Sequence, residues 1–133
     1  MVRTTLSIAT RARDEVVDLT AEVRRAVQAS GVREGLCLVF CPHTTAGLTI
    51  NEGYDPDVAR DLLTVLDRLV PWSGGYRHDE GNSAAHVKAL LCGPSQTVAV
   101  VAGELALGRW QALQFCEFDG PRNRQVVVSV LAG

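Results

Sequence analysis

The chain lacks the excess of basic residues that nucleic-acid-binding domains usually carry. Its 133 residues include 13 Lys and Arg against 15 Asp and Glu, so its net charge at pH 7 is −2, and its isoelectric point is near 5.9. Binding to a phosphate backbone depends on clustered positive charge. We therefore expect no nucleic acid among the partners of this protein.

Long apolar segments and paired cysteines are also missing. No apolar run approaches the ~20 residues of a membrane-spanning helix, and the N-terminal segment contains no hydrophobic signal region. None of the four cysteines forms a CxxC pair, which is typical of buried free thiols rather than of a zinc–thiolate site. These absences predict a soluble, cytoplasmic protein that does not associate with a membrane.

The sequence has no internal repeat, low-complexity segment or linker, so residues 1–133 are expected to form a single domain. It also lacks a GxSxG motif, which argues against a serine-triad hydrolase. Strand and helix patterns are mixed at first, and the chain from Gln96 onward has strand patterns only. This order predicts an α+β fold with mostly antiparallel strands.

Two strand patterns open the chain and a third follows the first helix. Arg3–Ala9 alternates polar and apolar residues, and Val16 with Val17 begins a short second strand, so a hairpin of the two is expected. Gly35–Cys41 is apolar on both faces. That segment should lie in the middle of a sheet or under a contact between subunits.

Helical periodicity marks three segments: Leu19–Ser30, Pro56–Val70 and Ala84–Leu91. Asp55 can cap the second helix, whose first position is a proline. In the third, the apolar stripe is expected to consist of Val87, Leu90 and Leu91.

The first polar-rich stretch, His43–Asp57, directly follows the apolar strand and reads HTTAGLTINEGYDPD. In a straight strand His43 and Asn51 would lie roughly 26 Å apart, at ~3.3 Å per residue, which is too far to serve one small ligand. We therefore expect Gly47 to bend the strand or to permit a close backbone approach.

The second polar-rich stretch, Tyr76–His86, reads YRHDEGNSAAH and leads into the third helix. Asn82 or Ser83 can cap this helix, which places His86 near its first turn. The start of a helix is a natural anion site, because its free N–H groups and its dipole favour negative charge.

The only three histidines are His43, His78 and His86, and all fall inside these two stretches. Three imidazoles suit zinc or a similar divalent ion with one position open for water or substrate. Their spacing does not match HExxH, so capping or surface roles remain the alternative. Among the acids, Glu52 and Glu80 have no evident structural role and are candidates for acid–base chemistry or metal contact.

Arginine forks bind phosphate through two hydrogen bonds, and Arg122 in the turn DGPR is the first candidate. Arg124, Lys88 and Arg109 are weaker candidates. The alternative is that these side chains are simply solvated.

Three segments, HTTAGLTINEGYDPDV, HDEGNSAAHVKALLCGPS and LGRWQALQFCEFDGPRNRQVVV, occur in this order. With them the chain resembles the YjbQ family, also called UPF0047, over essentially its whole length. The resemblance implies a mostly antiparallel two-sheet β-sandwich with flanking helices, which assembles into a homotrimer through sheet surfaces.

The resemblance also implies a metal site made by His43, His78 and His86, with zinc expected first and magnesium as the alternative with a diphosphate substrate. The resemblance places Asn51, Glu52, Glu80, Asn82 and Arg122 around these histidines. We expect catalytic roles for Asn51, Glu52, Glu80 and Asn82, and substrate binding by Thr45, Ser83 and Arg122. Some members carry an acidic residue directly before the asparagine of the second motif. Here Gly81 occupies that position, so Glu80 is the nearest acid.

The family is linked to a secondary thiamine phosphate synthase activity, which joins a pyrimidine diphosphate to a thiazole phosphate and releases pyrophosphate. The first hypothesis is therefore a metal-dependent transferase acting on small phosphorylated molecules. A second is a binding module that senses a metal or a phosphorylated metabolite without turnover. A third is that the histidines are structural and fasten loops within or between subunits.

Overall fold

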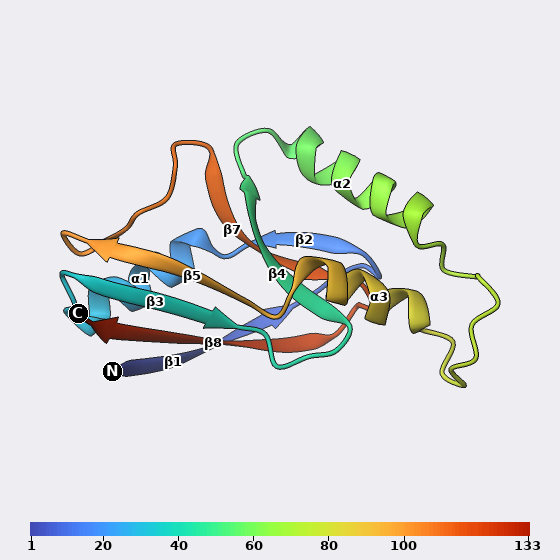
Figure 1. Ribbon diagram of the computed structural model, residues 1–133, viewed down its shortest axis with the longest axis horizontal. Helices are drawn as coiled ribbons and strands as arrows, with labels where there is room; N and C mark the ends of the chain where they lie inside the picture. The colour runs from blue at the N-terminus through green and yellow to red at the C-terminus, as the bar shows by residue number, and fades with distance from the viewer.

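The computed structural model describes residues 1–133 and contains eight strands and three helices (Figure 1). In chain order these are β1 (Val2–Ala9), β2 (Glu15–Asp18), α1 (Thr20–Ser30), β3 (Gly35–Phe40), β4 (Ala46–Glu52), α2 (Pro56–Leu69), α3 (Ser83–Cys92), β5 (Ser95–Val101), β6 (Glu104–Leu105), β7 (Gln111–Glu117) and β8 (Asn123–Ala132).

The strands form two sheets in which every pairing is antiparallel. A five-stranded sheet has the order β1-β8-β3-β5-β6, and a three-stranded sheet has the order β2-β7-β4. This arrangement confirms the predicted α+β class with two antiparallel sheets and helices. None of the three helices is long and apolar enough to cross a membrane.

The expected hairpin of the first two strands is wrong. β1 pairs with β8, so that Leu6 lies opposite Val126, while β2 pairs with β7, so that Val16 lies opposite Cys116. The two strands therefore belong to different sheets. Alternation in a sequence identifies a strand and its buried face, but it does not identify the partner strand.

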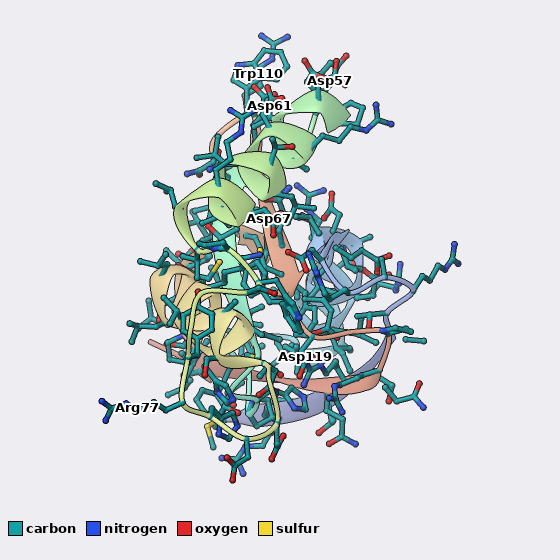
Figure 2. The ribbon with its side chains drawn as sticks, turned by 90° about the vertical axis from the view of Figure 1, so that its right-hand side faces the viewer. Asp57, Asp61, Asp67, Arg77, Trp110 and Asp119 are labelled. Carbon is teal, nitrogen blue, oxygen red and sulfur yellow. The ribbon has the colours of Figure 1, made fainter.

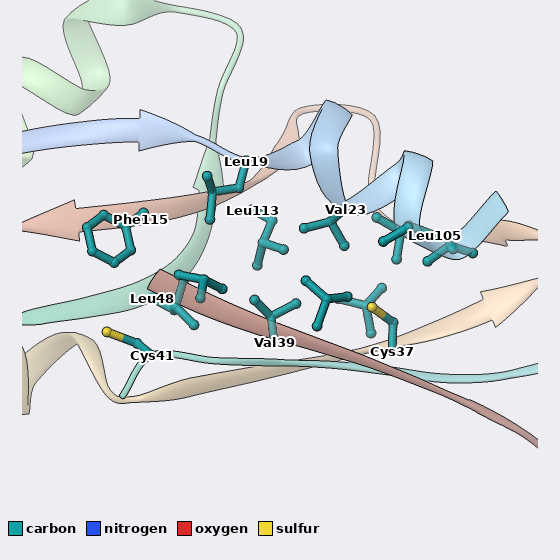
Figure 3. Packing of buried hydrophobic residues seen from close by; sticks show 14 of the residues in the cluster. Leu19, Val23, Cys37, Val39, Cys41, Leu48, Leu105, Leu113 and Phe115 are labelled. Carbon is teal, nitrogen blue, oxygen red and sulfur yellow. The ribbon is translucent and has the colours of Figure 1, made fainter. Parts of the chain in front are cut away.

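The main core is a cluster of 18 buried apolar residues in which α1 packs against both sheets (Figure 3). Val23 of α1, Val39 of β3 and Phe115 of β7 are all fully buried in this cluster. β3 lies between β8 and β5, which confirms its predicted place in the middle of a sheet. Its opposite face leaves three large apolar side chains exposed: Leu36, Leu38 and Phe40.

β4 has no bulge at Gly47, and the expected close backbone approach at this residue is present. β4 pairs with β7 residue by residue from Ala46 to Glu52 without interruption. A Cβ atom at Gly47 would lie 2.8 Å from the Cβ atom of Cys92 and 2.8 Å from the carbonyl oxygen of Gly93. Only glycine lets the end of α3 lie this close to β4.

The apolar stripe predicted for α3 is also wrong. Val87, Leu90 and Leu91 are exposed to 38%, 78% and 58%, and the helix instead buries three alanines and Lys88. Because α3 lies so close to β4, only small side chains fit between them. The buried positions of this helix are therefore not its most hydrophobic ones.

Two helix ends follow the sequence, whereas Asn82 precedes α3 without a capping hydrogen bond from its side chain. The Asp55 carboxylate accepts a 2.9 Å hydrogen bond from the N–H of Asp57 at the start of α2. Gly31 ends α1 with a φ of 71°, in the left-handed region that glycine adopts without strain. None of the residues of α2 is fully buried, so this helix covers the three-stranded sheet without entering the main core.

Candidate functional site

The candidate site lies at one end of the molecule, where three segments meet. These are the β3–β4 connection with His43, the start of α3 with Asn82 and His86, and the β7–β8 corner with Asp119 and Arg122. Figure 2 looks onto this end, with Asp119 in the lower half of the view and Trp110 at the far top. The polar-rich stretch Tyr76–His86 and the turn that contains Asp119 and Arg122 are therefore neighbours in space.

His78 and His86 face one another across the start of α3. Their ring centroids are 5.4 Å apart and their planes are nearly perpendicular. Two imidazoles bound to one tetrahedral zinc through bonds of about 2.0–2.1 Å have centroids about 5 Å apart. The spacing of this pair therefore fits two ligands of a shared metal ion.

His43 lies on the other side of a cavity of about 260 Å³ whose lining includes both His43 and His86. Its Nε2 atom is 2.9 Å from the N–H nitrogen of Gln125 and accepts that hydrogen bond when Nδ1 carries the proton. Burial, and then the nearby charge of Arg124, lower the pKa of His43. The imidazole is therefore neutral at neutral pH, as a metal ligand or a proton acceptor must be.

The three histidines do not form a compact triad within one chain. No group of three His, Cys, Asp or Glu side chains lies close enough together to hold a metal ion. Two of the three predicted ligands thus have a suitable spacing, and the third lines the same cavity as one of them.

A chain of hydrogen bonds joins the start of α3 to the β7–β8 corner. Nδ2 of Asn82 donates to Oδ2 of Asp119 at 2.8 Å, and Nη2 of Arg122 donates to the same oxygen at 3.1 Å. Nε of Arg122 donates to the backbone oxygen of Asp119 at 2.8 Å. Oδ1 of Asn82 is buried and has no hydrogen-bond partner in the protein, which is unusual for a buried acceptor.

The remaining predicted residues of this region have different surroundings. Ser83 is half-buried at the first position of α3. Thr45 is buried, and its hydroxyl oxygen accepts a 2.8 Å hydrogen bond from Nη2 of Arg124. Glu80 is exposed in the turn that follows His78 and makes no hydrogen bond or ion pair. Thr45 is therefore bonded to the buried Arg124, and the side chain of Glu80 is not fixed by any hydrogen bond or ion pair.

A buried ion pair beneath the site was missed by sequence reasoning. Glu117 is fully buried; its Oε1 accepts 2.8 Å hydrogen bonds from Nε of Arg124 and from the hydroxyl of Thr10. Its Oε2 accepts from the backbone N–H groups of Phe118 and Asp119 at 3.1 and 3.2 Å. One feature of the sequence could have indicated this buried carboxylate: Glu117 lies between the apolar residues Cys116 and Phe118 in the strand pattern Trp110–Phe118. This network holds the corner that carries Asp119.

Burial by itself would raise the pKa of Glu117. The hydrogen bonds from Arg124, Thr10 and the N–H of Asp119, together with the charge of Arg124, outweigh burial and hold the pKa of Glu117 below its ordinary value. Arg124, a candidate for phosphate binding from the sequence, is therefore already neutralised by a buried carboxylate.

Asn51 and Glu52 are not brought to the histidines within the chain. They end β4 on the side away from His43, where Oδ1 of Asn51 accepts a 2.7 Å hydrogen bond from the N–H of Glu52. The next residue, Gly53, donates to the carbonyl oxygen of Trp110 at 3.0 Å. Figure 2 places Trp110 far from Asp119, at the opposite end of this side of the molecule.

The other two candidates for phosphate binding also have other partners. Lys88 is fully buried between two carboxylates, 2.8 Å from Asp14 and 3.0 Å from Asp67. The guanidinium of Arg109 lies 4.7 Å from the ring centroid of Trp110. Arg122 is thus the candidate that lies at the histidine site.

The protein is an α+β domain with two antiparallel sheets and three helices, and its polar candidate site is built from three separate segments of the sequence. The chain belongs to the YjbQ/UPF0047 family, whose model, described as "UPF0047 protein YjbQ-like", matches residues 4–133.

Individual relatives agree with this assignment. The UPF0047 protein YugU of Bacillus subtilis (strain 168) is 50% identical over 128 residues, which cover 96% of this chain and 97% of the relative. A crystal structure of an uncharacterized conserved protein of the YjbQ/UPF0047 family from Clostridium acetobutylicum has a TM-score of 0.95 and 52% identity, and the match covers 96% of this chain and 99% of that chain. The hypothetical protein APE1520 from Aeropyrum pernix K1 has a TM-score of 0.96 at 33% identity, with both chains covered completely.

Proposed function

We propose that the protein is a metal-dependent transferase acting on small phosphorylated substrates, similar to secondary thiamine phosphate synthase. Such an enzyme joins a pyrimidine diphosphate to a thiazole phosphate and releases pyrophosphate. The observation that supports the proposal is the His78–His86 pair, 5.4 Å apart, at the start of a helix that is hydrogen-bonded to the corner carrying Arg122. Groups suited to a metal and groups suited to phosphate occur together there.

Under this proposal His78 and His86 would hold a divalent ion, and His43, which lines the same cavity as His86, would have to move toward the pair to become the third ligand. Zinc suits imidazole ligands, and magnesium is the alternative because a diphosphate would supply the oxygen ligands that magnesium prefers. When bound, the ion would stabilise negative charge on the departing diphosphate.

Arg122 is oriented before any substrate binds. Its Nε and Nη2 atoms both donate to Asp119, while its side chain remains 53% exposed. Nη1 makes no hydrogen bond within the protein and is therefore available to an anion. As the diphosphate departs, negative charge develops on its oxygen. A guanidinium that is already held in place stabilises that charge without having to change its own position first.

Asn82 and the first turn of α3 supply neutral polar groups. The helix start offers backbone N–H groups to a phosphate, and the buried Oδ1 of Asn82 offers an acceptor to a donor on the substrate.

The test is metal content and turnover of the full chain and its His86→Ala variant, with elemental analysis of protein purified without chelator. We expect about one ion per wild-type chain, a large loss of bound metal in the variant, and loss of thiamine phosphate formation. An Arg60→Ala variant is the control, because Arg60 lies on the exposed face of α2 with a side chain 78% exposed. Equal metal content and equal turnover in the histidine variant would contradict the proposal.

One observation favours the second candidate, a module that binds a metal or a phosphorylated metabolite without turning it over. Neither predicted acid is placed for proton transfer, because Glu80 is exposed in a turn and Glu52 lies at the far end of β4. This candidate predicts that inorganic pyrophosphate with zinc raises the melting temperature while no product forms from the two substrates. The absence of any shift would remove it.

We further propose that the protein is a homotrimer in which the outer face of the five-stranded sheet is covered. Leu36, Leu38 and Phe40 are exposed to 50%, 36% and 43% on the central strand of that sheet. Contiguous apolar side chains in the middle of an exposed sheet face are characteristic of a contact surface.

A further inference from the structure

A second cavity, of about 150 Å³, lies between α2 and the three-stranded sheet. Its wall from α2 is apolar and includes Leu62, Leu63 and Leu66, and its floor includes Gln114 and Cys116 of β7. None of the histidines lines it. This cavity is therefore separate from the candidate metal site.

Gln114 brings an unsatisfied acceptor to this cavity. The residue is 4% exposed, and its Nε2 donates a 3.1 Å hydrogen bond to the backbone oxygen of Glu52. That bond fixes the orientation of the amide, because only the NH2 group can donate to a carbonyl. Oε1 of Gln114 is inaccessible to solvent and has no hydrogen-bond partner in the protein. Buried acceptors are nearly always paired, so this oxygen lacks a donor, and a ligand can supply one only when α2 moves outward and uncovers it.

The volume sets the size of that ligand. An apolar cavity of about 150 Å³ in another protein holds one benzene molecule. We propose that the cavity under α2 binds a monocyclic aromatic molecule with one hydroxyl or amino group, whose ring packs against the leucines and whose donor reaches Oε1 of Gln114. A charged molecule would lose its hydration without an opposite charge to replace it.

Entry to the cavity does not require the main core to open. None of the residues of α2 is fully buried, and Val65, which also lines the cavity, is 48% exposed. A small outward movement of the helix exposes the cavity while the cluster around Phe115 stays packed. α2 is thus the cover of this site.

Phenol and toluene test the proposal because they have nearly the same shape and differ in one hydroxyl group. Calorimetric titration of the full chain should show that phenol binds about 5- to 10-fold more tightly than toluene, which is the ordinary gain from one buried hydrogen bond. In a Gln114→Leu variant that preference should disappear while toluene still binds. Equal affinity of the two probes for the wild-type protein, or no binding of either, overturns the proposal.

Matched variants of α2 locate the bound molecule. Leu62→Trp fills the cavity and should abolish binding of both probes, whereas Leu69→Trp, at a position on the same helix that is 69% exposed, should leave binding unchanged. If circular dichroism shows that Leu62→Trp is unfolded, Val65→Trp at the half-exposed rim replaces it. Phenol binding retained in a folded, filled variant overturns the proposal.

A histidine variant separates this site from the proposed transferase site. His86→Ala should retain full phenol affinity, because His86 does not line the cavity under α2. Loss of phenol binding in that variant would place the probe at the histidine cavity and overturn the inference. Loss of metal in the same variant bears only on the proposed function.

Discussion

The ammonium group of Lys88 lies 2.8 Å from the carboxylate of Asp14, and none of the lysine side chain is exposed to solvent. A second carboxylate, that of Asp67 on α2, lies 3.0 Å from the same nitrogen. One buried charge on α3 therefore joins the β1–β2 connection to α2. This contact matters because α2 has no fully buried residue of its own.

Replacing Lys88 with Met should destabilise the protein although the substitution removes a buried charge. Asp14 and Asp67 would keep only the guanidinium of Arg13, at 2.8 and 3.4 Å, in place of two cations. Breaking a buried ion pair from one side costs about 3–5 kcal/mol when the remaining charge stays buried and unpaired. Asp14 is 15% exposed and Asp67 is 51% exposed, so both can regain water. We expect a loss of about 1–3 kcal/mol, measured by urea denaturation.

The control for Lys88→Met is Arg60→Met. Arg60 also pairs with an aspartate of α2, at 3.4 Å, but both partners are more than 70% exposed. Exposed pairs contribute little to stability, so the urea midpoint should hardly change. Equal midpoints for Lys88→Met and the wild-type protein would show that the buried contact does not hold α2.

Glu117 predicts a loss of stability in acid. Its folded pKa is depressed, because hydrogen bonds from Arg124, Thr10 and the N–H of Asp119 outweigh the opposing effect of burial. For a carboxylate with a depressed pKa, the stabilisation is present above the ordinary value of 4.5 and is lost as the pH falls through the folded value. The urea midpoint should therefore fall as the pH is lowered below 4.5.

A Glu117→Gln variant should lack this part of the pH dependence. It should also be less stable at pH 7 by about 3 kcal/mol or more, because Arg124 would remain buried without a counter-charge. Glu104→Gln is the control, since Glu104 is exposed and makes no hydrogen bond or ion pair through its side chain. The same slope of midpoint against pH in wild-type protein and Glu117→Gln would contradict the assignment.

Much of the fold could be predicted from local pattern, and what could not depends on distant partners. The central place of β3 follows from a strand that is apolar on both faces, and the start of α2 follows from Asp55 and Pro56. The pairing of β1 with β8 joins opposite ends of the chain, and no local pattern encodes it. The buried face of α3 was misjudged because its spacing from β4 is set by Gly47, in another segment.

The candidate site was predicted in part for the same reason. The histidine motifs identify the end of the molecule at which His78 and His86 meet, and Arg122 joins that end through Asp119. Asn51 and Glu52 belong to the same sequence motif as His43, but an unbroken strand carries them away from it. A motif in a sequence therefore does not ensure that its residues share one site.

The cysteines should differ strongly in the rate at which their thiols react with an alkylating reagent. Burial raises the pKa of the Cys37 thiol to about 11, and Cys37 is fully buried. A hydrogen bond from Cys116 lowers the pKa of Cys92, the one cysteine that is not fully buried. Because the thiolate is the reactive form, iodoacetamide at pH 8 should modify Cys92 first and leave Cys37 unmodified.

Mass spectrometry of digested samples over a time course measures this order. Protein unfolded in urea is the control, because all four thiols should then react at similar rates. Modification of Cys37 in the folded protein as fast as that of Cys92 would show that the core around β3 opens readily.

The proposed trimer predicts that one charge on β3 is enough to prevent assembly. Phe40 is 43% exposed on the outer face of the five-stranded sheet, so Phe40→Asp should cost little in an isolated chain but would bury a carboxylate in a subunit contact. Sedimentation velocity should show wild-type protein at three times the chain mass of 14.3 kDa and the variant at that of one chain. Leu69→Asp is the matched control, since Leu69 is 69% exposed on α2 and away from this face. Wild-type protein that sediments as a monomer would contradict the trimer, and a trimeric Phe40→Asp variant would place the contact on another surface.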